Sequence, residues 1–232
     1  MREFNALAGY PEPTRPRVVG PNLRTIRNRI IASSRGQEFY DGDRNNGYGG
    51  LAYDGRWVPI SKFMAKAYGL TNASAVLQIN CEKGFLLHDF QQLFPGMQVR
   101  GVEISDYCLE QAMPSVRPWM VKAPFTRLPF ADREFDLVIA IGVVYALTLA
   151  EAIVSLKEIQ RVGKGKSFIT LASYDTPEDK QLFEWWTLLG TLLLRRDEWV
   201  EVLEHAGYTG DYTFADAKTL KLVEAQHAEE VA

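Results

Sequence analysis

The sequence predicts an α/β fold with a doubly wound, mostly parallel sheet and helices on both faces. From residue 75 to residue 173, short apolar runs alternate with segments of helical pattern. The segment Phe135 to Ile141 is dominated by apolar residues, as a strand buried on both faces requires. Turn residues such as the pair Pro95-Gly96 separate the segments. Such alternation implies parallel strands joined by right-handed crossovers.

The chain before this alternation is expected to form an arm and a lid. Its first part carries Pro11, Pro13, Pro16 and Pro21, and proline fixes φ and removes a donor, so an extended arm is predicted. Three further segments follow in order: a helix from Leu23 to Ser33 capped by Asn22, a structured loop rich in glycine and aromatic residues from Tyr40 to Trp57, and a helix from Lys62 to Tyr68 ended by Gly69.

The alternation and the segments after it predict seven strands. These strands are Ala75 to Asn80, Gln98 to Glu103, Trp119 to Ala123, Phe135 to Ile141, Ser167 to Ser173, Thr209 to Phe214 and Leu220 to Val223. The expected helices are Gly84 to Leu93, one capped by Ser105 or Asp106 that ends near Pro114, Leu149 to Val162, an inserted helix from Pro177 to Leu194, and Asp197 to His205. We therefore divide the chain into an arm and lid, residues 1–60, and a ligand-binding domain, residues 61–232.

Composition limits the possible partners. Hydrophobic residues make up 47% of the chain, which suits a globular protein with a full core. The net charge of -3 gives no basic footprint, so nucleic acid is not expected as the main partner. Cys81 and Cys108 are too few for a disulfide framework, and the N-terminus lacks the apolar core of a signal peptide. We expect a cytoplasmic protein with no membrane partner.

Three signals follow one another in the order that a nucleoside-binding half-sheet requires. The first apolar run leads into the tight turn Cys81-Glu82-Lys83-Gly84 and then a helical pattern. Nineteen residues after Gly84, the acid Glu103 closes the second apolar run, where a carboxylate can accept both ribose hydroxyls. The third signal is the segment from Leu128 to Ile139, which opens with Leu-Pro-Phe.

This order resembles class I S-adenosylmethionine-dependent methyltransferases, which have a Rossmann-like fold, over roughly Ile60 to Tyr174. The resemblance implies S-adenosylmethionine as cofactor, an N-terminal lid, and a final pair of strands that forms an antiparallel hairpin on the sheet edge. The strings Gly47-Tyr48-Gly49-Gly50 and Tyr53-Asp54-Gly55-Arg56-Trp57 also resemble small bacterial methyltransferases of metabolite or surface-carbohydrate modification.

The first loop departs from the pattern of that family. Gln78 stands where the family has an acid, while Asn80 and Glu82 replace two glycines and only Gly84 remains. Asparagine visits positive φ more readily than most residues, so Asn80 is a tolerable substitute. Glu82 must point away from the cofactor or accept a hydrogen bond from its ammonium group. The alternative is an ordinary turn in a catalytically degenerate binding protein, a pseudoenzyme.

The resemblance implies a set of cofactor-binding residues around the strand ends. Glu103 would bind the ribose and Ile104 would line the adenine slot. Pro124 replaces an acid that often binds the adenine amino group, so Phe125 and nearby backbone would hold the base. The full predicted set is Gln78, Asn80, Cys81, Gly84, Glu103, Ile104, Phe125 and Ile141.

The acceptor side is expected to lie between the segment after the fourth strand and the lid. Tyr145 is the candidate catalytic residue, orienting the acceptor or lining the methyl path; a packed core tyrosine is the alternative. Tyr48, Arg56 and Trp57 are the candidate substrate-binding residues of the lid, since aromatic faces attract cations and arginine binds anions; a packed arm is the alternative. The predicted reaction is methyl transfer to oxygen or nitrogen of a small polar metabolite or sugar, and a homodimer is a possible assembly.

Two other functions are weaker. A nicotinamide oxidoreductase is disfavoured because the first loop lacks Gly-x-Gly-x-x-Gly. His88 follows Gly84 by one helical turn and could act as a base, but such a residue is more often structural. With His205 and His227 it forms no cluster with metal-ligand spacing, so no metal site is expected.

Overall fold

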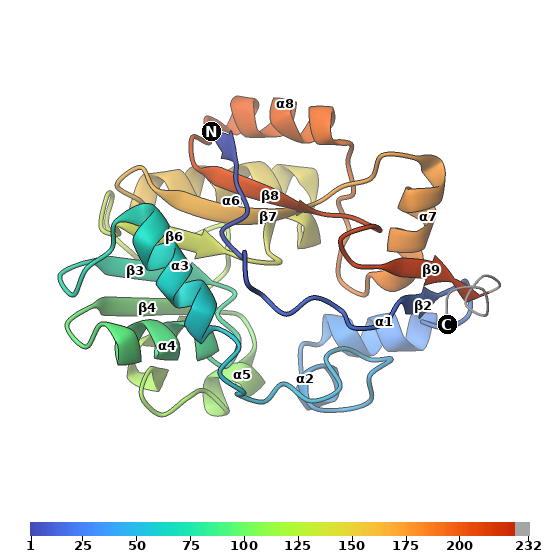
Figure 1. The fold of residues 1–232 in the computed structure, drawn as a ribbon, viewed down its shortest axis with the longest axis horizontal. Coiled ribbons are helices and arrows are strands. Elements are labelled where there is room, and N and C mark those ends of the chain that lie inside the picture. The colour runs from blue at the N-terminus through green and yellow to red at the C-terminus, as the bar shows by residue number, and fades with distance from the viewer. Residues whose placement is uncertain (226–232) are drawn as a thin grey trace.

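The computed structural model describes residues 1–225, and Figure 1 shows a central sheet with helices on both sides. The sheet has seven strands in the order β1-β8-β7-β6-β3-β4-β5, and every neighbouring pair runs parallel. The strands are β1 (Arg2–Glu3), β3 (Ala75–Ile79), β4 (Gln98–Glu103), β5 (Met120–Lys122), β6 (Leu137–Ala140), β7 (Ser167–Ala172) and β8 (Asp211–Ala215). The predicted doubly wound α/β fold is confirmed.

The strand order reverses at β3, which has β4 on one side and β6 on the other. In the register of these strands, Leu77 lies opposite Arg100 of β4 and Val138 of β6. All residues of β6 and β7 are buried, because helices cover both faces of the sheet there. A sheet that reverses its order leaves a crevice beyond the carboxyl ends of the two central strands.

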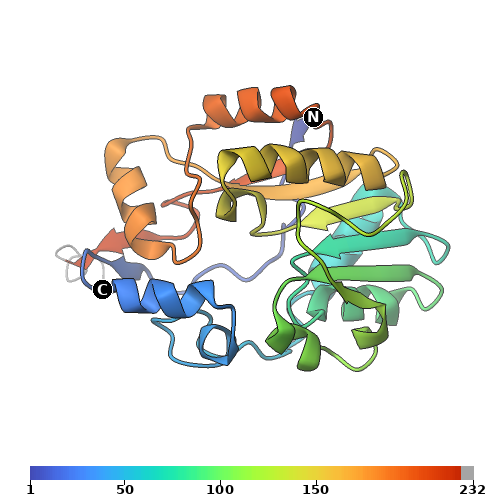
Figure 2. The same cartoon turned by 180° about the vertical axis from the view of Figure 1, so that it is seen from behind.

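Helices divide between the two faces, as Figure 2 shows from the side opposite to Figure 1. The long helices are α3 (Val58–Tyr68), α4 (Phe85–Leu93), α6 (Leu149–Val162), α7 (Pro177–Trp186) and α8 (Arg196–Ala206), and the short ones are α1 (Ile26–Ser33), α2 (Gln37–Tyr40), α5 (Asp106–Glu110), η1 (Arg117–Trp119) and η2 (Val144–Ala146). Apolar residues of α3 and α4 form one core with the sheet, and those of α6 and α8 form the other. None of the helices in residues 1–225 has the length and apolar character that crossing a membrane requires.

The predicted antiparallel hairpin at the sheet edge is wrong. β8 pairs in parallel with β7, whereas β9 (Leu222–Glu224) leaves the sheet and pairs in parallel with β2 (Arg17–Val19). The cause is the turn between them, where Asp216 Oδ1 accepts the Thr219 amide at 2.8 Å and directs the chain away from the edge. The edge is taken by β1, whose Arg2 guanidinium binds the Asp211 carboxylate at 2.7 and 3.0 Å.

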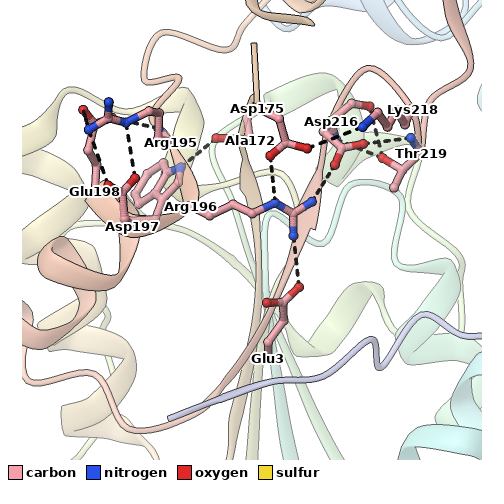
Figure 3. A network of polar contacts seen from close by, with 11 residues as sticks. Glu3, Ala172, Asp175, Arg195, Arg196, Asp197, Glu198, Asp216, Lys218 and Thr219 are labelled. Carbon is pink, nitrogen blue, oxygen red and sulfur yellow. Dashed lines mark hydrogen bonds and ion pairs between the residues drawn. The ribbon is translucent and has the colours of Figure 1, made fainter.

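Arg196 joins the N-terminal strand to the loops around this edge, as Figure 3 shows. Its guanidinium contacts Glu3 at 3.2 Å, Asp175 at 3.4 Å and Asp216 at 2.7 Å. Next to it, the Trp199 indole donates to the Ala172 carbonyl at 2.6 Å. The arm therefore belongs to the central sheet at its start, and the division at residue 60 stays a prediction.

Several element ends differ from the sequence-based expectation. α1 begins at Ile26, because Thr25 rather than Asn22 accepts the amide of Asn28. α3 begins at Val58, since a proline is accommodated in the first helical turn, and it ends at Gly69 as predicted.

Other differences lie farther along the chain. α5 ends at Glu110 instead of near Pro114, and α7 ends at Trp186 instead of Leu194. After α7 the backbone becomes extended, and Leu194 forms an isolated β-bridge with Ser173, the residue directly after β7. The last seven residues of the predicted domain, His227 included, lie outside the described residues.

Candidate active site

A cavity of about 690 Å³ lies beyond the carboxyl ends of β3 and β6. Figures 1 and 2 both place α1, α2, α7 and the β2–β9 pair beyond those strand ends. The strand ends form the floor of the cavity, and the N-terminal segment and the stretch after α7 form its other walls. Predicted site residues on its wall are Gln78, Asn80, Ile141, Tyr48, Arg56, Trp57 and Tyr145. Seven of the residues predicted from the sequence therefore meet at one cavity, and their roles stay predictions.

The turn after β3 has the left-handed backbone that the family loop requires. Asn80 has a φ of 57°, Glu82 of 52° and Gly84 of 79°. At Gly84 a Cβ atom would lie 2.7 Å from the Val116 side chain, so this position accepts only glycine without a shift. Asparagine thus serves at residue 80 as predicted, and the turn keeps its shape with one glycine.

Polar groups of the first loop face the cavity. The Asn80 side chain donates to the Ile141 carbonyl at 3.3 Å and accepts from Arg35 at 3.1 Å. The buried Gln78 Oε1 has no hydrogen-bond partner within the described residues, although Gln78 lines the cavity. A buried acceptor without a partner is costly, so a ligand donor at this point would stabilise the site.

Glu82 is the acidic residue of the cavity floor. Its side chain is half-buried and accepts a hydrogen bond from the Tyr48 hydroxyl of the lid. Burial raises the pKa of Glu82 to about 7, against the lowering effect of the Tyr48 hydrogen bond. The carboxyl group therefore changes protonation near neutral pH, and it also ties the lid to the first loop.

Glu103 is placed at the end of β4, as predicted, but it does not reach the cavity. The residue is fully buried, and its carboxylate accepts the backbone amides of Glu82, Ile104 and Ser105 at 2.8, 2.8 and 3.0 Å. These three bonds hold the first loop next to the start of α5. The predicted cofactor residues that the cavity does not reach are Cys81, Gly84, Glu103, Ile104 and Phe125.

A segment that sequence reasoning did not assign covers this part of the site. Tyr40 of α2 is fully buried and stacks between Tyr48 and Tyr107, with ring centroids 5.7 and 6.2 Å away. It packs with Cys108 of α5, and burial together with the nearby Glu103 charge raises its pKa. α2 was missed because four residues are too few to show a helical period.

The lid residues contact one another as well as the cavity. Arg56 is paired with Asp54, its guanidinium lying 2.6 Å from the carboxylate, and Trp57 packs on Tyr10 with centroids 5.0 Å apart. Tyr53 donates to Asp89 at 2.6 Å and is absent from the cavity wall. Arg56 therefore has its charge balanced within the lid.

Tyr145 lies in η2, directly after the end of β6. Its ring borders the cavity, and its hydroxyl makes no hydrogen bond with any residue in the described range. Burial raises the pKa of Tyr145, and the Glu82 charge adds to this effect. The hydroxyl therefore stays protonated and can donate to a ligand.

His88 is not part of the cavity. Its Nδ1 lies 2.7 Å from the Ser115 hydroxyl, and its ring packs against Tyr53. Within residues 1–225, His, Cys, Asp and Glu side chains do not gather in a group of three that could hold a metal ion.

Comparison with known proteins identifies the central segment. Residues 77–171 match a family described as a methyltransferase domain. Over 101 residues the chain is 32% identical to malonyl-(acyl-carrier protein) O-methyltransferase of Legionella pneumophila. The matched segment covers 41% of this chain and 36% of that protein. The chain thus spans about a third of the length of this relative.

Solved structures agree on the fold. The YcgJ protein of Bacillus subtilis matches with a TM-score of 0.52 at 18% identity, over 63% of this chain and 66% of that one. A candidate methyltransferase of Bacillus halodurans C-125 matches with a TM-score of 0.52 at 16% identity, over 63% of this chain and 68% of that one.

Proposed function

Because this chain carries a class I S-adenosylmethionine-dependent methyltransferase domain, we propose that it transfers a methyl group to oxygen or nitrogen of a small polar molecule, a metabolite or a sugar. The observation that carries the proposal is the walled cavity of about 690 Å³ beside the carboxyl ends of β3 and β6. That volume is typical of small-molecule sites, and walls on several sides suit a small acceptor better than a duplex or a protein surface.

The residues of the floor fit the methionine end of S-adenosylmethionine. The unpartnered Gln78 Oε1 and the Glu82 carboxylate are acceptors for its ammonium group, and Arg35 is a donor for its carboxylate. Glu103, Ile104 and Phe125 are the proposed adenosine contacts, and they become accessible when α2, with its buried Tyr40, moves away. When bound, S-adenosylmethionine supplies an electrophilic methyl group on a sulfonium centre.

The protein's own contribution is orientation and exclusion of water. The free Tyr145 hydroxyl donates a hydrogen bond to the acceptor and fixes its direction, while Tyr48 and Trp57 close the cavity from the lid. Displacement at a methyl group requires an in-line approach and desolvated reactants, so alignment by these groups is the main catalytic effect.

A catalytically degenerate binding protein is the second candidate. One observation favours it: Glu103 is fully buried beneath the segment that contains Tyr40, and its carboxylate already binds three backbone amides. In that case the cavity would bind a small molecule without methyl transfer.

Calorimetric titration with S-adenosylmethionine, followed by transfer of its labelled methyl group to a metabolite panel, tests both candidates. Micromolar binding and a labelled small-molecule product support the methyltransferase. Binding without product on any substrate supports the binding protein. Product on DNA, tRNA or protein alone would contradict the small-molecule acceptor.

The homodimer is also a proposal. Ile26 and Ile30 are 72% and 63% exposed and lie four residues apart on α1, so they share one face of that helix. Light scattering on the Ile30→Glu variant and the wild type tests it: a dimer that dissociates in the variant supports this face, and a wild-type monomer contradicts it.

A further inference from the structure

Three arginines that sequence reasoning did not assign gather on the wall of the cavity. Arg17 comes from β2, Arg24 lies two residues before the start of α1, and Arg44 lies in the loop after α2. Burial, together with the charges of Arg44, Arg29 and Arg17, lowers the pKa of Arg24 to about 10. The three guanidinium groups are therefore close enough to repel one another.

These charges lack a protein counterion. In the part of the chain that the structure describes, no carboxylate forms an ion pair with Arg17, Arg24 or Arg44, whereas Arg56 on the same wall is paired with Asp54. Glu12 also lines the cavity, but its carboxylate is bound to Lys221 at 3.2 Å. The protein as a whole is acidic, with a net charge of -3, so the cluster does not reflect a generally basic surface.

Most donors of the cluster are free for a ligand. Arg24 donates to the Trp186 carbonyl and Arg44 to the Gly47 carbonyl, each through one nitrogen, and no side-chain hydrogen bond from Arg17 occurs within residues 1–225. The Trp186 ring holds Arg17 and Arg24 in place, with guanidinium carbons 5.7 and 5.6 Å from its centroid. Each guanidinium carries five N–H donors in a planar fork that matches an oxyanion.

We propose that the small-molecule acceptor is a phosphate ester, whose phosphate group binds between Arg17, Arg24 and Arg44. The role of the phosphate ester as methyl acceptor rests on the proposed function, whereas the phosphate-binding site does not. Phosphate is favoured over a carboxylate because its three terminal oxygens and its charge near -2 match three guanidinium groups, while a carboxylate offers two oxygens and one charge. Arg35 is bonded to Asn80 at the first loop and is left for the cofactor.

The first test uses inorganic phosphate without cofactor. Titration followed by ³¹P NMR should show saturable binding to the wild type, and Arg44→Ala should weaken it at least tenfold. Arg27→Ala is the matched control, because Arg27 is an exposed arginine of α1 that does not line the cavity, and it should change the affinity less than twofold. Arg24→Lys keeps the positive charge but removes the planar guanidinium with its paired N–H donors, and it should also weaken phosphate binding.

Acetate separates a phosphate site from a general anion site. Acetate should bind at least tenfold more weakly than phosphate to the wild type. Equal binding of the two anions, or an equal effect of Arg44→Ala and Arg27→Ala, would overturn the proposal. Because cofactor is absent, this result is independent of whether the protein transfers methyl groups.

The second test compares phosphorylated and dephosphorylated members of the metabolite panel with labelled S-adenosylmethionine. Product should form on phosphate esters and fall at least tenfold on the matched alcohols, and Arg44→Ala should remove this preference. Equal product on both members overturns the acceptor class. If nothing is methylated, the proposed function fails, and the phosphate titration still decides the anion site.

Discussion

The Lys83 ammonium lies 2.6 Å from the Asp41 carboxylate, which joins the first loop of the domain to the segment that covers Glu103. Lys83 is buried and also donates to the Leu51 carbonyl at 2.9 Å. The Tyr107 hydroxyl of α5 donates to the same Asp41 carboxylate. Lys83 thus holds both Asp41, directly after α2, and Leu51, within the lid, over the proposed adenosine site.

We predict that Asp41→Asn loosens this segment. The neutral amide loses the ion pair, so residues 37–51 should exchange their amide hydrogens about tenfold faster, while β6 and β7 exchange as before. Hydrogen exchange with mass spectrometry measures both. Asp43→Asn is the control, since Asp43 is exposed and forms no ion pair within the described residues. Equal exchange in the two variants contradicts a latch at Asp41.

The ion pair between Asp41 and Lys83 should also make the free energy of unfolding depend on pH in acid. Burial acts to raise the pKa of Asp41, but hydrogen bonds from Lys83 and Tyr107 outweigh it and hold the pKa below its usual value. A carboxyl with a depressed folded-state pKa stabilises the native state above its unfolded pKa and loses that contribution as pH falls through the folded value. The Asp41→Asn effect on the free energy of unfolding should therefore shrink as the pH falls below about 4, the ordinary pKa of an aspartate.

For Glu82 we predict a pH dependence of the free energy of unfolding with the opposite sign. Its folded-state pKa of about 7 lies above the unfolded value, so the folded state binds the extra proton between these values. Stability should fall by about 1–2 kcal/mol as pH rises from 4.5 to 7, after allowance for solvent screening at this half-buried site. Denaturant unfolding of wild type and Glu82→Gln across this range tests it. The variant should lack that slope, and a parallel slope in both proteins refutes the assignment.

Glu103 is predicted to have both a structural and a ligand-binding effect. Glu103→Gln removes the charge from three hydrogen bonds to buried amides, which should lower the free energy of unfolding by about 2–3 kcal/mol. It should also weaken S-adenosylmethionine at least tenfold by calorimetry, a loss of about 1.4 kcal/mol or more. Glu110→Gln on the exposed side of α5 should do neither. Unchanged cofactor affinity in a folded Glu103→Gln protein would remove Glu103 from the proposed site.

Tyr145 is predicted to act on the acceptor alone. Tyr145→Phe keeps the ring and removes the free hydroxyl, so methyl transfer should fall about tenfold to a hundredfold while the affinity for S-adenosylmethionine stays within twofold. Tyr174→Phe, a half-buried tyrosine outside the cavity wall, is the control. Full activity in Tyr145→Phe would favour the alternative in which Tyr145 is a packing residue.

Elements with local signals were predictable from the sequence. The bounds of β4 and α6 match the prediction, because the residues of these segments carry the signals: β4 is a short run after the Pro95-Gly96 turn, and α6 has a capping box at Thr148 and Glu151. The place of β9 was not predictable. Besides the turn at Asp216, it depends on pairings between distant segments: β9 pairs with β2, and β1 occupies the sheet edge through Arg2 and Asp211, which are 209 positions apart.

The same distinction holds in the site. The strand-end positions of Gln78 and Asn80 followed from the turn after the first strand, and that of Ile141 followed from the end of the fourth apolar run. The covering of Glu103 by Tyr40 and the meeting of Arg17 with Arg24 and Arg44 depend on how the N-terminal segment folds over the sheet. No local pattern marks these contacts, since each involves residues from separate elements.

The last prediction concerns the lid, residues 46–57. In the structure it is held by three hydrogen bonds to side chains of the domain: Tyr48 to Glu82, Tyr53 to Asp89 at 2.6 Å, and the Leu51 carbonyl to Lys83. Tyr48 and Tyr53 are nevertheless each 40% exposed, so a large part of their aromatic surface is still accessible to solvent. Burial at roughly 25 cal/mol per Å² of apolar area nearly balances the entropy of ordering the loop, so a bound ligand should decide its state.

Hydrogen exchange of residues 46–57 with and without S-adenosylhomocysteine measures that balance. Protection of the lid should rise at least tenfold when the ligand is bound, because closure buries the aromatic rings and excludes water. Residues 37–40 of α2 should respond as well, since the adenosine site opens only when they move. Equal protection of the lid in both states would make it a rigid part of the arm, and Arg56 and Trp57 would then no longer be candidates for substrate binding.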